Sequence, residues 1–255
     1  MVKFVLFYFL AFSFYIVSAQ SKSYSTANAH SHNDYENSIP FSLAFENGFG
    51  SIEADIYCIN DTLFVAHNKQ DIKPGRTLKN LYLDPLNREL AKDPKHKLIL
   101  LIDIKDDYKA SLSQLVKELS PLKKYLSDQS KQKQLRIVIS GNRPRPDEYI
   151  NYPPFIFFDD DLKLTHTLNE WARVGLVSLP FYRIARWNGK DKISDADSIA
   201  IKQVVDSVHA AGKRIRFWAA PDNEVSWQTQ MNLHIDLIGT DKILALTSFL
   251  NRKQK

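Results

Sequence analysis

Cysteine is almost missing from this sequence, since Cys58 stands alone among 255 residues. A single thiol excludes an intrachain disulfide and any metal site built from several cysteines. A metal ion bound by this chain must therefore be held by oxygen atoms or by histidine.

The chain also lacks a strong excess of charge of either sign. Lys and Arg number 34 against 29 Asp and Glu, a formal net charge of +5, and the basic residues are scattered except around Lys123 and Lys131. Binding of nucleic acid is typically marked by a basic stripe with exposed aromatic residues. We therefore expect no nucleic-acid partner. With 44% hydrophobic and 25% charged residues, the composition is that of an ordinary globular chain.

No long apolar run follows residue 17. The run at residues 4–17 is preceded by Lys3, and its last residue, Val17, begins the Val-Ser-Ala sequence that precedes Gln20. This arrangement predicts a secretory signal peptide over residues 1–19, cleaved after Ala19, and a mature domain over residues 20–255. An N-terminal membrane anchor is the alternative, but the run is short for a bilayer span. We expect an exported protein, periplasmic or secreted, with no transmembrane anchor after cleavage.

Glycine-rich nucleotide motifs are missing as well, since neither G-x-G-x-x-G nor G-x-x-x-x-G-K-[ST] occurs. Their absence disfavours a doubly wound open sheet. The chain instead contains eight strand-like runs, at residues 24–29, 51–56, 97–104, 135–140, 155–158, 174–179, 214–219 and 235–238, and a hairpin strand at 62–66. Helices are expected at residues 38–47, 108–127, 162–173, 194–211 and 224–232, and Pro121 is expected to end or kink the second of them. This alternation predicts an α/β fold, a single-domain (β/α)8 TIM-type barrel.

Acidic residues gather at the ends of the second and third predicted strands. Glu53 and Asp55 are two apart and share a face, as do Asp103 and Lys105. Three converging carboxylates repel each other unless a cation neutralises them, and such oxygen ligands favour Mg²⁺ or Ca²⁺. A Glu-x-Asp pair is often only a solvated face, and Asp103-x-Lys105 could be a structural ion pair. Asp103 nevertheless interrupts an apolar buried strand, where an unpartnered carboxylate is costly.

Histidines occur at the same predicted rim. His30 and His32 end the first strand, and His67 ends the hairpin strand. A single histidine is commonly structural. Together with a metal site, however, one imidazole can accept a proton from an attacking oxygen while another protonates the leaving oxygen of a phosphodiester.

These motifs carry a resemblance to a known family. AHSHNDYEN at residues 29–37, Gly48, IEADI at 52–56 and VAHN at 65–68 resemble the opening of the glycerophosphodiester phosphodiesterase and phosphatidylinositol-specific phospholipase C-like superfamily. The HSHNDY form resembles a poorly characterised branch of it. LIDIK at 101–105 is similar to the third metal-ligand strand, with Asp where Glu is usual, and residues 214–218 and 236–241 resemble the last two strands.

The resemblance implies a TIM-type barrel, one divalent cation and two catalytic histidines. Carried over by position, Lys105 would bind phosphate and Trp218 would line the substrate pocket. The implied metal ligands are Glu53, Asp55 and Asp103, and the implied catalytic histidines are His67 with either His30 or His32.

This sequence departs from the family at the first histidine. The usual His-Arg pair is absent, because His30 is followed by Ser and His32 by Asn. Both histidines remain candidates, and we favour His32 because Asn33 and Asp34 adjoin it and could orient it. Glu36 is either a further ligand or a residue at a helix start.

Other polar residues follow later strands. Arg143 could bind a phosphate with two hydrogen bonds, although an exposed loop arginine is as good an interpretation. Acidic residues 159–161 are interpreted as attracted to a helix N-terminus. Tyr182 and Arg183 are candidate substrate contacts, and Cys58 is interpreted as a packing residue.

The sequence therefore predicts an exported, metal-dependent phosphodiesterase acting on a glycerophosphodiester, a phosphoinositide or a related phospholipid head-group diester, by histidine acid/base catalysis. The alternative is a catalytically weak barrel that binds a phosphorylated or carbohydrate ligand. The joint presence of the histidines and the three carboxylates speaks against that alternative.

Overall fold

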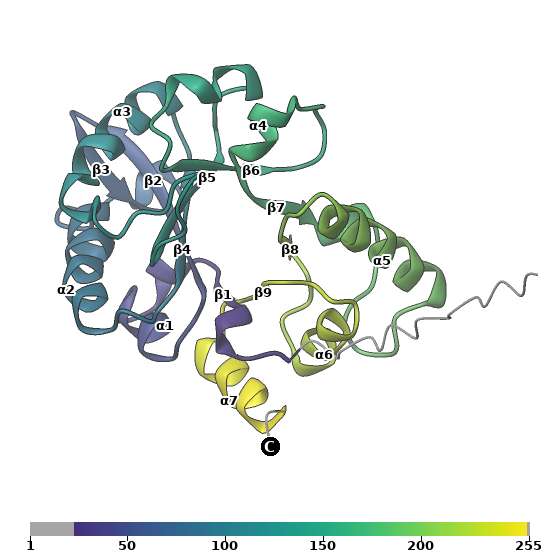
Figure 1. Cartoon of the computed structure of the whole chain (residues 1–255). Coiled ribbons are helices and arrows are strands. Elements are labelled where there is room, and N and C mark those ends of the chain that lie inside the picture. The colour runs from purple at the N-terminus through teal and green to yellow at the C-terminus, as the bar shows by residue number, and fades with distance from the viewer. Residues whose placement is uncertain (1–22, 254–255) are drawn as a thin grey trace, which may run out of the picture.

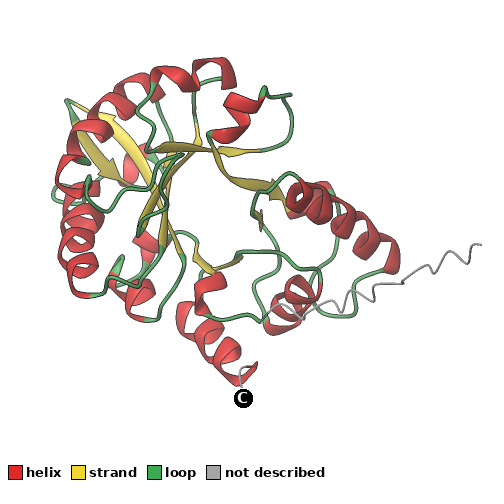
Figure 2. Ribbon diagram, viewed as in Figure 1, coloured by secondary structure: helices red, strands yellow, loops and turns green. Residues whose placement is uncertain are grey.

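A computed structural model describes residues 23–253. Eight parallel strands lie in the order β8-β7-β6-β5-β4-β2-β1-β9, and a ninth, β3, pairs antiparallel with β2. The ends of this order meet where Arg216 of β8 pairs with Leu237, just before β9. The strands form an inner ring with helices outside it (Figures 1 and 2), a nearly closed barrel that confirms the predicted TIM-type fold. The predicted signal peptide at residues 1–19 lies outside the described residues.

The strands are β1 (Ala29–Ser31), β2 (Ser51–Ile59), β3 (Thr62–Val65), β4 (Leu98–Ile104), β5 (Leu135–Gly141), β6 (Ile156–Asp160), β7 (Val174–Pro180), β8 (Ile215–Trp218) and β9 (Ile238–Thr240). The helices are α1 (Ser42–Glu46), α2 (Asp84–Lys92), α3 (Tyr108–Glu118), α4 (Leu168–Ala172), α5 (Asp195–Ala210), α6 (Glu224–Asn232) and α7 (Ile243–Lys253). None of the helices within residues 23–253 is long and apolar enough to cross a membrane.

The first strand differs most from its prediction. It begins at Ala29 because the preceding residues, Thr26–Asn28, form a 3-10 turn capped by Ser25, whose Oγ accepts from the amide of Ala27. His30 therefore lies within a strand and not after one.

Several predicted helices are shorter in the structure. The helix expected at 162–173 forms only over α4, and the one expected at 38–47 only over α1. Helix α3 ends at Glu118, just before Pro121, as expected of that proline. Proline cannot donate the backbone hydrogen bond that would continue a helix. Helices α2 and α7 were not predicted, and α2 continues from a π-helical turn at Lys79–Leu83.

The inside of the barrel is layered along its axis. Its middle is apolar and consists of the buried side chains Ile99, Leu101, Val138, Phe157, Leu176 and Leu237. Because residues two apart on a strand share a face, the next inward positions toward the carboxyl ends hold Asp103, Ser140, Asp159 and Ser178. Polar groups thus cover this apolar layer, the apolar plug, at the carboxyl end of the barrel, where TIM-type enzymes have their active sites.

Candidate active site

A cavity of about 810 Å³ opens at the carboxyl ends of the strands. It brings together most of the predicted site: His32, Glu53, Asp55, His67, Asp103, Lys105, Arg143 and Trp218. It does not include His30, which is fully buried, nor Glu36, which is exposed. The side chains come from segments far apart in the sequence, and the barrel alone places them side by side.

The three predicted metal ligands form one cluster. Glu53, Asp55 and Asp103 each offer a carboxylate oxygen, and these atoms lie within 4.8 Å of one another. Asp55 and Asp103 are opposite each other in the register of β2 and β4. Lys105 joins them, because its Nζ is 2.8 Å from Asp55 Oδ2 and 3.0 Å from Asp103 Oδ2. The register of β2 and β4 and the alternation of side chains along each strand thus bring the three carboxylates together, as the sequence predicted.

The cluster suits a divalent cation. Asp55 Oδ1 and Asp103 Oδ1 are buried and have no hydrogen-bond partner among the described residues. Burial raises the pKa of Asp103 more than Lys105 lowers it, and the neighbouring carboxylates raise it further. Burying a carboxylate oxygen without a partner costs folding free energy. Such oxygens are the ligands that hard cations such as Mg²⁺ and Ca²⁺ prefer.

Glycine at position 141 makes room for Asp103. Gly141 ends β5 at φ +67°, and a Cβ there would lie 1.9 Å from Asp103 Oδ1 and 2.5 Å from the carbonyl oxygen of Ile104. Any side chain would therefore displace Asp103, in a backbone conformation that glycine alone adopts readily.

His30 lies beneath the cavity, bound to a metal-ligand candidate. Its Nε2 is 2.8 Å from Glu53 Oε2, and its Nδ1 is 2.8 Å from Ser51 Oγ. Arg216 Nη1 contacts the same Glu53 oxygen at 2.9 Å. Burial, followed by the charge of Arg216, lowers the pKa of His30 to about 4. A neutral, fully buried His30 thus fixes the carboxylate of Glu53 and has no access to a bound substrate.

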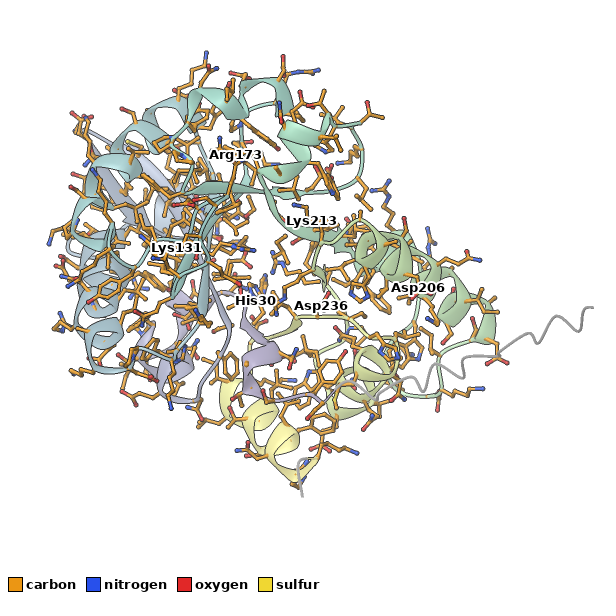
Figure 3. The ribbon with its side chains drawn as sticks, in the orientation of Figure 1. His30, Lys131, Arg173, Asp206, Lys213 and Asp236 are labelled. Atoms are coloured by element: carbon orange, nitrogen blue, oxygen red, sulfur yellow. The ribbon has the colours of Figure 1, made fainter. Side chains whose placement is uncertain are left out.

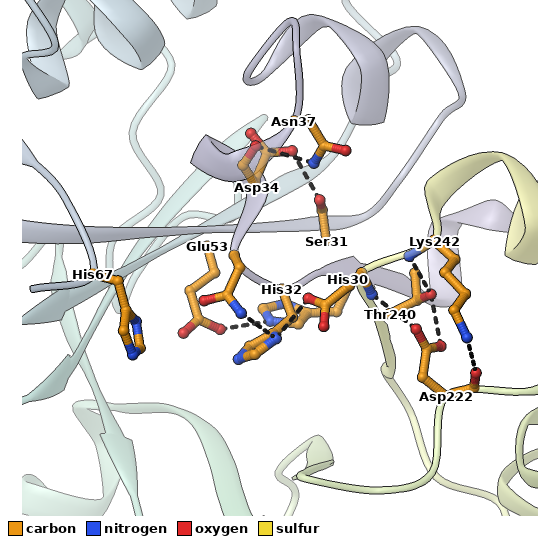
Figure 4. A network of polar contacts seen from close by, with 12 residues as sticks. His30, Ser31, His32, Asp34, Asn37, Glu53, His67, Asp222, Thr240 and Lys242 are labelled. Atoms are coloured by element: carbon orange, nitrogen blue, oxygen red, sulfur yellow. Dashed lines mark hydrogen bonds and ion pairs between the residues drawn. The ribbon is translucent and has the colours of Figure 1, made fainter. Parts of the chain in front are cut away.

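His32 reaches the cavity and is oriented by a carboxylate. Its Nδ1 lies 2.8 Å from Oδ1 of Asp241 and 3.1 Å from Nδ2 of Asn33. Figure 4 labels His32 near Glu53 and His30. Burial alone would lower the pKa of His32, but the hydrogen bond to Asp241 and the charge of Glu53 raise it above its ordinary value. The Nε2 atom has no hydrogen-bond partner among residues 23–253, so it is available to a ligand.

His67 is held in a similar way. Its Nδ1 is 3.1 Å from Asp55 Oδ2 and 3.2 Å from the Tyr35 hydroxyl, which itself donates to Asp55 Oδ2 at 2.8 Å. The side chain of His67 is 56% exposed. Each cavity histidine is therefore anchored at Nδ1 next to a carboxylate, and its Nε2 has no hydrogen-bond partner among residues 23–253.

Asp34 fixes the segment that carries Tyr35. Its buried carboxylate accepts a hydrogen bond from Ser31 Oγ at 2.8 Å (Figure 4). It also accepts from the Phe41 amide at 2.6 Å and from the Tyr82 hydroxyl at 3.0 Å. The sequence suggested that Asp34 could orient His32. The structure shows instead that Asp34 braces the loop after β1 while Asp241 contacts the imidazole.

The interpretation of residues 159–161 is wrong. Helix α4 begins at Leu168, so no helix N-terminus follows these acids, and Asp159 and Asp160 are the last residues of β6. All three line the cavity. Burial raises the pKa of Asp159 to about 7 despite the nearby Arg216, and its Oδ1 has no partner among the described residues.

Aromatic and basic side chains form the mouth of the cavity. Trp218 ends β8 and packs edge-on against Tyr182, with ring centroids 5.5 Å apart. Arg143 and Arg183 line the cavity as well, and Arg143 Nη2 is 3.8 Å from Asp161 Oδ1. The candidate substrate contacts named from sequence thus all lie around one opening.

Sequence reasoning missed Arg216, Tyr35 and Asp241 as parts of the site. Arg216 could have been found from strand alternation, since it shares a face with Trp218 two residues later. Nothing local marks Tyr35 or Asp241, because each acts on a residue that only the folded chain brings near.

Comparisons with known proteins agree with this geometry. The model of the AIM6-like phosphodiesterase domain matches residues 19–93, the part that carries both histidine motifs and Glu53 and Asp55. The chain is 26% identical to the altered inheritance of mitochondria protein 6 homolog of Arthroderma benhamiae, covering 86% of this chain and 82% of that protein. It is also 26% identical to altered inheritance of mitochondria protein 6 of Eremothecium gossypii, over 86% of this chain and 68% of that protein.

Solved structures show the same fold at low sequence identity. A calcium-dependent phosphoinositol-specific phospholipase C from Pseudomonas matches with a TM-score of 0.60 and 14% identity, covering 88% of this chain and 93% of that one. A glycerophosphodiester phosphodiesterase from Parabacteroides distasonis matches with a TM-score of 0.57 and 15% identity, covering 89% and 98%. The resemblance seen in the sequence is confirmed: this chain has the fold of the phospholipase C-like phosphodiesterases, and its first part matches the AIM6-like phosphodiesterase domain.

Proposed function

We propose that the chain is a divalent-cation-dependent phosphodiesterase that cleaves a glycerophosphodiester, a phosphoinositide or a related head-group diester. One observation carries the proposal, namely that His32, His67 and three carboxylates line a single cavity. The solved structures of similar fold include a phosphodiesterase from Oleispira antarctica in complex with the product sn-glycerol-3-phosphate, with a TM-score of 0.52 and 12% identity, covering 88% of this chain and 95% of that one.

Glu53, Asp55 and Asp103 would hold the cation, which when bound supplies positive charge next to the non-bridging oxygens of the phosphate. Lys105 stands beside the same carboxylates. The neighbouring carboxylates raise its pKa although burial opposes this, so its ammonium remains charged and can bind a phosphate oxygen.

The two histidines divide the proton transfers. His32, whose pKa is raised, carries a proton and donates it from Nε2 to the leaving oxygen as the P–O bond breaks. His67 Nε2 accepts the proton of the attacking hydroxyl, from water or from the substrate itself, as the new P–O bond forms. Asp241 and Asp55 hold the two Nδ1 atoms and so keep each Nε2 turned toward the substrate.

Hydrolysis of bis(p-nitrophenyl) phosphate with Mg²⁺, Ca²⁺ or Mn²⁺ tests the proposal. Activity should disappear with a chelator and return with the metal. His67→Ala and Asp103→Asn should each lower turnover about 100-fold or more, whereas the exposed Asp61→Asn serves as a control with unchanged activity. No turnover on a panel of diesters would leave the alternative, a barrel that binds a phosphorylated or carbohydrate ligand. Phosphorus NMR of the products distinguishes a cyclic phosphate from a hydrolysed monoester.

We also propose that the protein is exported, on the composition of residues 1–19 alone. Mass spectrometry of the protein recovered from its native host should find a mature chain that begins at Gln20. An intact N-terminus in the cell pellet would contradict export.

A further inference from the structure

The end of the barrel opposite the candidate active site is basic. Two adjoining recesses of about 210 Å³ and about 50 Å³ lie there, and Arg136 and Arg214 line both of them. Lys213 lines the larger recess, and Lys97 and Lys133 line the smaller one. Figure 3 labels Lys213, which directly precedes Arg214 and β8.

The two arginines belong to the inside of the barrel. Arg136 shares a face of β5 with Val138 and Ser140, and Arg214 precedes β8 in phase with Arg216. The apolar plug of the barrel, described above, separates them from the cavity. This basic site is therefore distinct from the candidate active site.

The guanidinium groups of Arg136 and Arg214 are unpartnered. Within residues 23–253, neither makes a side-chain hydrogen bond or an ion pair, although both are only partly exposed. Arg136 instead lies over the ring of Phe157, with 4.9 Å from Cζ to the ring centroid. Lys213 Nζ donates to the carbonyl oxygen of Val174 at 2.8 Å, which leaves its charge unneutralised. Partly buried arginine donors without acceptors are unfavourable unless an anion or water supplies them.

Two acids near the recesses offset part of the positive charge, but each also binds groups other than the two guanidiniums. Asp128 lines the larger recess, but its Oδ1 accepts from the amides of Ser130 and Lys131, both at 2.8 Å. The charge of Asp236 raises the pKa of Arg214 against the effect of burial, but Asp236 Oδ2 accepts from the Ile215 amide and contacts His209 Nε2, each at 2.8 Å. Residues 1–22 and 254–255 contain no Asp or Glu that could neutralise the recess.

Neighbouring positive charges lower the pKa of two of these basic side chains. Burial, and then the charge of Arg214, lowers the pKa of Arg136, while burial and Arg136 lower that of Lys213. A small anion between them would remove this mutual repulsion, because opposite charges at close range favour the charged forms.

We propose that Arg136, Lys213 and Arg214 form a binding site for a small phosphate-type oxyanion at the amino-terminal end of the barrel. The planar guanidinium groups offer paired N–H donors that match two phosphate oxygens, and Lys213 adds a point charge. This site is independent of the proposed phosphodiesterase activity.

Titration calorimetry of the protein with inorganic phosphate, in a buffer with EDTA, tests the site. Wild-type protein should bind phosphate, and Arg136→Gln and Arg214→Gln should each weaken binding about tenfold or more, since each removes charged hydrogen bonds. Arg88→Gln changes an exposed arginine on α2 and should leave the affinity unchanged. Lys105→Gln should weaken the binding of any phosphate in the candidate active site, and the binding that depends on Arg136 and Arg214 should remain in this variant.

Two outcomes would overturn the proposal: wild-type protein that fails to bind millimolar phosphate, or binding that is lost in Lys105→Gln but kept in Arg136→Gln. Thermal unfolding in phosphate-free buffer checks that the variants fold, and Arg214→Lys, which keeps the charge, should retain part of the affinity. Absence of diester turnover would refute the proposed function and leave this test unaffected.

Discussion

The cavity side chains are held in place by other side chains as much as by the backbone. His32 depends on Asp241 and His67 on Asp55, each through Nδ1. Glu53 is fixed by His30 and Arg216. The residue types at the rim could be predicted from sequence, but these supporting contacts join residues up to 209 positions apart.

Replacement of Gly141 by Ala should affect both stability and the metal site. The positive φ costs about 1–2 kcal/mol for a residue with a Cβ, and the new methyl group would push Asp103 aside. We expect a lower free energy of unfolding in denaturant titrations and a weaker divalent cation affinity. Gly75→Ala is the matched control, since Gly75 has φ +80° and a methyl group there would meet nothing within 4 Å, so it should lose stability only. Equal cation affinity in both variants would refute the role assigned to Gly141.

The protonation of His32 should depend on Asp241. Because the pKa of His32 in the folded state is raised above its unfolded value of about 6.5, the protonated ring stabilises the fold fully below that pH. This contribution is lost as the pH rises through the folded pKa. In Asp241→Asn, histidine NMR titration should find the pKa of His32 lowered, and the alkaline limb of the turnover profile should move to lower pH. An unmoved titration would show that Asp241 does not set the charge of His32.

Strand alternation and register, at the level of elements, explain why the carboxylates converge. β2 and β4 place Asp55 opposite Asp103, and a shift of β2 by one residue would turn Glu53 and Asp55 to the other face. The least extensive strand pairing within residues 23–253 is that between β8 and β9, where a lone bridge joins Arg216 and Leu237. A side-chain hydrogen bond reinforces this junction, since the Ile215 amide of β8 donates to Asp236 Oδ2 at 2.8 Å.

Asp236→Ala should loosen this junction. The change leaves the buried Ile215 amide without its acceptor and removes the contact with His209, a loss of about 1–3 kcal/mol. Amide hydrogen exchange should quicken in β8 and β9 more than in β4. Asp206→Ala removes an exposed pair with Lys202 on α5 and should change the unfolding free energy by no more than about 0.5 kcal/mol. Uniform exchange across all strands would argue against a local opening.

At the scale of the whole molecule, the closed barrel brings three carboxylates together at the carboxyl ends of its strands. The free energy of unfolding should therefore depend on cation binding. The carboxylate of Asp103 opposes folding when no cation is bound, because burial and the neighbouring carboxylates raise its pKa. A ligand that binds only the folded state stabilises it in proportion to the logarithm of its concentration.

Thermal unfolding should therefore respond to divalent cations. At a concentration of about 100 times Kd, Ca²⁺ or Mg²⁺ should stabilise the wild-type protein by about 2.7 kcal/mol, and EDTA should reverse the effect. Asp103→Asn should lose this response while the metal-free protein is as stable as wild type or more so, because a buried charge is removed. An unchanged melting temperature in saturating cation would refute the metal site.

The sequence by itself determined the barrel and most of the residues at its rim. Burial and strand alternation are local patterns, so the apolar run at 97–104 and the Glu53-x-Asp55 pair could be interpreted without a structure. Only the tertiary structure decided that His32, and not His30, reaches the cavity, because a capped turn at Thr26–Asn28 moves the first strand forward and buries His30. The tertiary structure also shows that residues 159–161 line the cavity and do not begin a helix. It places Arg136 and Arg214 together, without hydrogen-bond partners among the described residues, at the amino-terminal end of the barrel. These outcomes depend on which strands become neighbours, and that is a property of the closed barrel and not of any one segment.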